Sequence, residues 1–153
     1  MEKDKVFNII SSPSELSEKE EILSRCYNDL IYFGRAFLPN DFLNKSQSPS
    51  FHYEVAKKLI STKPGARVCN IMPRGFGKSI LAKAAILHKI CFSPSEERNF
   101  IAWVAEEQGQ AIDHLKYIRN HLESNRSIQY YFGQLAGDLA GKRWTEKDLV
   151  TAK

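Results

Sequence analysis

The chain has 153 residues, of which 42% are hydrophobic and 26% are charged, values typical of one folded domain with its own core. No apolar run approaches the ~20 residues of a membrane span, and the charged N-terminus lacks a signal-peptide core, so we expect no membrane partner. The net charge is +4 with the basic excess after residue 25, which is compatible with DNA binding without requiring it.

The first part of the chain predicts an arm followed by two helices. Residues 1–16 are expected to form a flexible arm. Ser17, with a glutamate three residues later, has capping-box spacing and predicts a helix to about residue 37. Its expected apolar face is Leu23, Cys26, Leu30 and either Phe33 or Phe37. Residues 39–49 predict a polar loop, and residues 51–60 predict a second helix.

The second part predicts alternating strands and helices. Residues 67–72 and 99–105 are short, largely apolar runs, which favours two buried strands. Helical periodicity follows each run, from Ser79 onward and over residues 107–123, and residues 144–152 predict a third strand or a hairpin arm. This order is typical of an α/β fold, with an incomplete parallel sheet flanked by helices and preceded by a helical segment.

A glycine-rich segment lies at the first predicted strand–helix junction, and it reads Pro73, Arg74, Gly75, Phe76, Gly77, Lys78 and Ser79. Its end matches the phosphate-binding pattern G-x-x-x-x-G-K-[ST], although Met72 replaces the first glycine. Glycines let backbone N–H groups approach phosphates closely. Lys78 is expected to reach the β- and γ-phosphates, and Ser79 to hold Mg²⁺. Arg74 is expected to add a second cation, with a solvated loop charge as the alternative. We therefore predict ATP binding in a P-loop NTPase fold; a glycine turn before an ordinary helix is the alternative.

Two further groups bear on this prediction. Phe51 and His52 offer a stacking face and a polar group that suit adenine, although aromatic residues at a helix start also pack into cores. Hydrolysis needs acidic residues near Mg²⁺ and the attacking water. Glu106 and Glu107 end the second predicted strand, but Glu107 is better explained as part of the following helix. We expect the catalytic acids to be missing from this chain.

Taken in order, these segments resemble the N-terminal part of the ATPase domain of the large terminase subunit of tailed bacteriophages. The matching segments are residues 35–39, 49–54, 73–79, 105–111 and 143–151. The resemblance implies an ATPase in which Lys78 and Arg74 are catalytic and Ser79 binds Mg²⁺. It also implies that residues 73–79, with Phe51 and His52, contact ATP.

The same resemblance implies partners and a larger parent protein. Double-stranded viral DNA, the small terminase subunit, the portal protein and further copies in a ring would be its partners, at the phage assembly site in the host cytoplasm. Residues 17–153 would be a partial ATPase domain, because such subunits continue into a Walker B pair, a coupling motif and a nuclease domain. Two alternatives stay open: another P-loop ATPase of helicase or phage-defence type, or a degenerate, non-catalytic interaction module.

Overall fold

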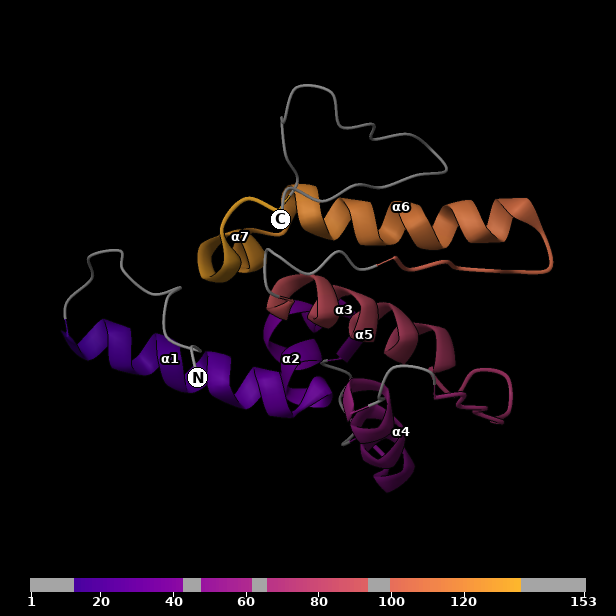
Figure 1. The fold of residues 1–153 in the computed structure, drawn as a ribbon, viewed down its shortest axis with the longest axis horizontal. Helices are drawn as coiled ribbons and strands as arrows, with labels where there is room; N and C mark the ends of the chain where they lie inside the picture. Colours follow the sequence, from indigo (N-terminus) through magenta and orange to yellow (C-terminus); the bar gives the residue numbers. More distant parts are fainter. Residues whose placement is uncertain (1–12, 43–47, 62–65, 94–99, 136–153) are drawn as a thin grey trace.

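The computed structural model describes residues 13–42, 48–61, 66–93 and 100–135, and these ranges form helices joined by extended segments and turns. The helices are α1 (Pro13–Asn28), α2 (Leu30–Phe37), α3 (Pro39–Phe42), α4 (Ser50–Ser61), α5 (Lys78–Phe92), α6 (Gln108–Ser124) and α7 (Arg126–Phe132). Figure 1 shows α6 along the top of the molecule above α5, with α1 and α4 below. The termini of the predicted helices 51–60 and 107–123 agree with α4 and α6 to within a residue.

The predicted parallel sheet, and with it the P-loop NTPase fold, is wrong for the residues that the structure describes, because none of them forms a strand. Residues 67–72 and 100–105 do not pair, and Ile71 and Phe100 are 91% and 93% exposed. A helix satisfies its backbone hydrogen bonds within one segment, whereas a strand needs a partner segment. Apolar composition alone was therefore insufficient to make these runs a sheet. The third predicted strand, residues 144–152, lies outside the described residues, as do residues 1–12 of the predicted arm.

The single helix predicted up to residue 37 is divided at Asp29. This residue is extended, with φ −133° and ψ 106°, and its carboxylate accepts hydrogen bonds from the backbone of Ile31 at 2.8 Å and Tyr32 at 3.0 Å. An aspartate that caps a helix in this way competes with helix continuation. The result is two helices, α1 and α2, in place of one, and α1 already begins at Pro13.

The hydrophobic core is centred on α2, which packs against α1, α3, α4, α5 and α7. Phe33 and Phe37 are fully buried and touch each other with ring centroids 5.0 Å apart. Burial of a phenylalanine side chain contributes about 1.5–3 kcal/mol. From α5 the core receives Leu81, Ala84, Leu87, His88 and Cys91. This packing fixes the body of α5 and leaves its N-terminal end at the surface.

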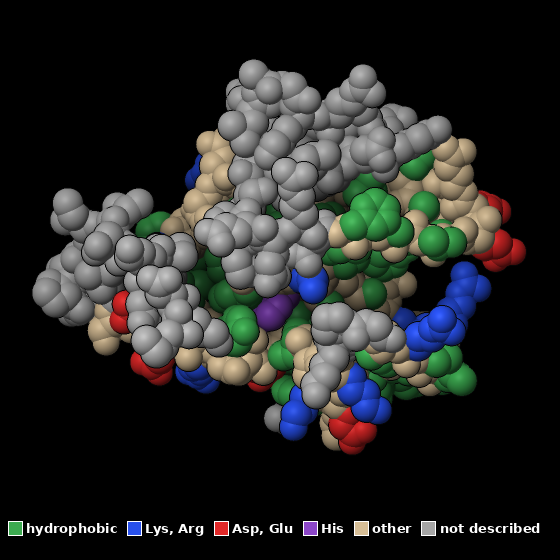
Figure 2. Space-filling model, in the orientation of Figure 1, with side chains coloured by type: hydrophobic (Ala, Val, Ile, Leu, Met, Phe, Trp, Pro, Cys, Tyr) green, Lys and Arg blue, Asp and Glu red, His purple; other side chains and the backbone are tan. Residues whose placement is uncertain are grey.

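Helix α6 covers the other side of α5, and its buried residues are Ile118 and Leu122. The extended segment before α6 runs back along that helix (Figure 1), where the rings of Trp103 and His114 lie 4.5 Å apart. Hydrophobic side chains are exposed along this segment (Figure 2), including Val104 at 89%. Within the described part of the chain, no helix has both the length and the apolar character needed to cross a membrane.

Candidate functional site

The glycine-rich loop leads directly into α5, and its backbone is left-handed at both glycines. Gly75 has φ 86° and Gly77 has φ 75°, values that side chains with a Cβ rarely adopt. Gly77 is the N-cap of α5, and no side chain caps this helix. The first backbone N–H groups of a helix have no partner within it. The loop therefore presents unpaired donors at the positive end of a helix dipole, the arrangement that binds anions.

Positive charge lies at the same place. The ammonium group of Lys78 donates to the backbone carbonyls of Met72 and Pro73, the latter at 2.9 Å. Arg74 and Ser79 are exposed on either side of it in the sequence. Figure 2 shows basic side chains at the end of the molecule where Figure 1 places this loop. The Lys78 ammonium is therefore held at the start of the loop by two backbone carbonyls.

Helix α4 approaches the loop from its first turn. His52 Nε2 lies 3.0 Å from the carbonyl oxygen of Phe76, and the rings of Phe51 and Phe76 are 5.8 Å apart. In the same turn, the Tyr53 hydroxyl accepts a hydrogen bond of 3.3 Å from the Arg35 guanidinium on α2. Three of the segments singled out in the sequence, residues 35–39, 49–54 and 73–79, are therefore joined by direct contacts.

These residues fit a magnesium-bound triphosphate. The uncapped α5 N-terminus and the Lys78 ammonium offer several donors to phosphate oxygens, and the exposed Ser79 hydroxyl offers an oxygen to Mg²⁺. The described residues contain no group of three or more His, Cys, Asp or Glu that could hold a metal ion. A metal ion at this loop would therefore depend on phosphate oxygens and water for most of its ligands, as Mg²⁺ commonly does.

Glu106 and Glu107 belong to the turn before α6, and Glu107 is the N-cap of that helix without a side-chain cap bond. Figure 1 places this turn and the glycine-rich loop at the same end of the long axis. No hydrogen bond or ion pair joins either glutamate to the described loop. The structure thus brings Phe51 and His52 to the loop and gives Glu106 no defined contact with it.

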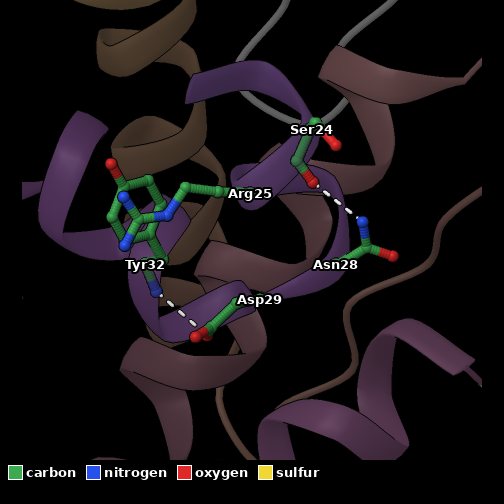
Figure 3. A pocket seen from close by; sticks show the side chains of 5 residues that line it. All are labelled: Ser24, Arg25, Asn28, Asp29 and Tyr32. Carbon is green, nitrogen blue, oxygen red and sulfur yellow. Dashed lines mark hydrogen bonds between the residues drawn. The ribbon is translucent and has the colours of Figure 1, made fainter. Parts of the chain in front are cut away.

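A polar hollow of about 300 Å³ lies at the junction of α1 and α2 (Figure 3), and it is lined by Ser24, Arg25, Asn28, Asp29 and Tyr32. Its polar groups already serve the fold. Asp29 caps α2, the Asn28 amide donates to the Ser24 carbonyl at 2.8 Å, and Arg25 stacks over the Tyr32 ring at 4.3 Å. This hollow contains none of the motif residues, and its polar contacts stabilise the α1–α2 break.

An apolar groove of about 450 Å³ lies between α4, α5 and residues 101–104. Its lining includes Leu59, Ile86, Ile101 and Trp103, together with Lys89 at its edge. The groove lacks the convergent polar groups that orient a small ligand. It accounts for part of the exposed apolar surface and does not overlap the glycine-rich loop.

One polar cluster was missed at the level of sequence. The Tyr117 hydroxyl of α6 donates to the Asp41 carboxylate of α3, and the Lys83 ammonium of α5 lies 4.0 Å from the centroid of the Tyr117 ring. Burial, with this hydrogen bond, raises the pKa of Tyr117, and burial lowers the pKa of His121 beside it. The i, i+4 spacing of Tyr117 and His121 was a readable signal, but their distant partner Asp41 was not.

Comparison of the chain with protein-family models, with curated proteins and with solved structures gave no match. The resemblance to terminases consequently rests on the motifs in the sequence.

Proposed function

We propose that residues 73–79 bind the phosphates of ATP with Mg²⁺, and that the chain is the ATP-binding part of a DNA-packaging motor of the terminase type. In such a motor, ATP hydrolysis is coupled to movement of double-stranded viral DNA into a capsid. The observation that carries the nucleotide-binding part is the loop itself. Gly75 and Gly77 are left-handed, and they lead into an uncapped helix whose first residue is a lysine.

Each residue of the loop has a defined task in this proposal. The unpaired N–H groups at the start of α5 donate to phosphate oxygens, and the helix dipole favours their negative charge. Lys78 leaves the carbonyls of Met72 and Pro73 to neutralise the β- and γ-phosphates. Ser79 contributes its hydroxyl to Mg²⁺, and Arg74 adds charge beside the glycines.

The motor part of the proposal is supported by the order of the motif segments and by the contacts among three of them. Arg35 donates a hydrogen bond to Tyr53, and His52 contacts the loop at Phe76, so these segments lie next to one another. An ATPase also needs acidic side chains that activate the attacking water. Among the described residues, no acidic side chain contacts the loop. DNA, the small terminase subunit, the portal protein and further copies of the chain remain the partners proposed for the parent motor.

Calorimetric titration of the chain with ATP and Mg²⁺ tests the nucleotide-binding proposal. We expect saturable binding that weakens about 10- to 100-fold in Lys78→Ala, because a hydrogen bond to a charged group contributes about 1.5–3 kcal/mol. Lys89→Ala is the matched control, since Lys89 is an exposed lysine in the last turn of the same helix. It should bind ATP as the wild type does.

Two results would contradict the proposal: no measurable affinity of the wild type for ATP and Mg²⁺, or equal affinity in Lys78→Ala. Either would favour the non-catalytic interaction module. Selective weakening in Lys78→Ala would support the loop as the phosphate site.

A further inference from the structure

The hydrogen bond between α4 and the glycine-rich loop links residues that are 24 positions apart. His52 Nε2 lies 3.0 Å from the Phe76 carbonyl oxygen. A carbonyl oxygen can only accept, so the imidazole carries its proton on Nε2 and donates. His52 is half-buried in the first turn of α4, and Gly77 lies close to it. A Cβ added to Gly77 would come within 3.5 Å of His52 Nε2.

The direction of one peptide group follows from this bond. The Phe76 carbonyl and the Gly77 N–H belong to the same peptide unit, and no peptide bond in the described chain is cis. In a trans peptide these two groups point in opposite directions. Because His52 holds the carbonyl toward α4, the Gly77 N–H points away from α4. It is one of the donors that α5 leaves without a side-chain cap.

We infer that His52 is a positioning residue for the phosphate site: by holding the Phe76 carbonyl, it orients the Gly77 N–H toward the phosphates of the ligand. This inference rests on the proposed function of the loop. In this inference His52 acts through the backbone of the loop, in place of the contact with adenine expected from the sequence. Phe51, whose ring centroid lies 5.8 Å from that of Phe76, remains the side chain proposed to contact adenine.

The two possible roles of His52 predict that its replacement weakens the binding of different ligands. A residue that orients a backbone donor affects any ligand with the phosphates, including one without a base. A residue that contacts adenine affects adenosine and leaves a bare triphosphate unchanged. Inorganic tripolyphosphate with Mg²⁺, and adenosine, are therefore the two probes.

The experiment measures binding of both probes to wild type, His52→Ala and His52→Gln by calorimetry and NMR titration. We expect His52→Ala to lose about fivefold in tripolyphosphate affinity, the effect of one neutral hydrogen bond. His52→Gln should recover most of this loss, because its amide N–H can donate to the Phe76 carbonyl. Adenosine affinity should be the same in all three proteins.

Tyr53→Phe is the matched control, since it removes the bond between Arg35 and the same turn of α4 without removing a donor to the loop. It should leave tripolyphosphate affinity unchanged. The inference is overturned if wild type binds tripolyphosphate and His52→Ala binds it equally well, if Gln and Ala lose equally, or if Tyr53→Phe loses as much as Ala. If the wild type binds neither ATP nor tripolyphosphate, the proposed function itself is overturned.

Discussion

The helical core of this protein buries large apolar side chains, whereas its two extended segments leave such side chains exposed. Phe33 on α2 is fully buried, whereas Phe100 in the segment before α6 is 93% exposed. Both lie in apolar runs of the sequence that predict burial. The residues from 66 to 73 and from 100 to 105 precede the helices α5 and α6, and a short turn separates each run from its helix.

The difference shows that apolar composition and regular structure have separate causes. α2 forms from local information, because its hydrogen bonds close within eight residues and Asp29 caps its first turn. An extended run gains its hydrogen bonds only from another segment, which no local pattern specifies. Helices are therefore readable from a stretch of sequence, and strand pairing is not.

The largest change in stability is expected when one phenylalanine in each region is replaced by alanine. Phe33→Ala should lower the free energy of unfolding by about 3–5 kcal/mol, because it removes a buried ring and leaves a cavity among Phe37, His88 and Phe92. Phe100→Ala should change it by less than about 0.5 kcal/mol, as for other exposed positions. Urea unfolding followed by circular dichroism measures both.

A loss of several kcal/mol in Phe100→Ala would break the comparison, since it would show that residues 100–105 are buried in solution. Equal and small losses in both variants would show that the packing around α2 is not the main core.

The second test concerns the junction between an extended segment and its helix. Gly77→Ala should destabilise the protein by about 1–2 kcal/mol, because a left-handed backbone at φ 75° is unfavourable with a Cβ. Gly109, in the first turn of α6, has open space where a Cβ would lie and is the matched control. Gly109→Ala should stabilise by about 0.5–1 kcal/mol, because alanine is the better helix former.

The same unfolding measurement distinguishes these two glycines by the sign of the change. Destabilisation by both alanines to the same extent would show that the loop conformation at Gly77 makes no special demand. Stabilisation by Gly77→Ala would mean that the backbone is not left-handed at Gly77, and the N–H groups of the loop would then not be arranged to bind an anion.

Much of the helical structure was predictable, and the reasons for the remainder are physical. Leu23, Cys26, Leu30, Phe33 and Phe37 are buried as predicted, although Leu23 and Cys26 lie on α1 and the other three lie on α2. The break at Asp29 was missed, since an aspartate between two apolar turns is compatible with a continuous helix until its carboxylate caps the second one.

The candidate site also has one part that a local pattern predicts and one part that depends on packing. Residues 73–79 were singled out from their own pattern, because their glycines, lysine and serine have the spacing typical of phosphate-binding loops. The contact of His52 with the Phe76 carbonyl depends on how α4 packs, and no local pattern specifies it. His88 was also missed as a core residue, because a histidine on an apolar helix face is buried only where neighbouring carbonyl oxygens accept a hydrogen bond from its N–H.

The smallest expected effect concerns the pH dependence that His88 gives the core. Its Nε2 donates to the carbonyls of Cys26 at 3.1 Å and Tyr27 at 3.2 Å, which joins α5 to the end of α1. Burial lowers the pKa of His88, and these two hydrogen bonds oppose the shift. The unfolded chain therefore binds this proton more readily than the folded protein does.

The sign follows from this difference in proton binding. The contribution of His88 to stability is fully present above the ordinary histidine pKa of about 6.5 and is lost as the pH falls below it. In His88→Gln, whose amide remains neutral and can still donate, the free energy of unfolding should fall less between about pH 7.5 and pH 5.5. One proton sets an upper limit of about 1.4 kcal/mol per pH unit on the difference in slope. Urea unfolding of both proteins at the two pH values measures it, and an equal fall in both would show that His88 titrates alike in the folded and unfolded chain.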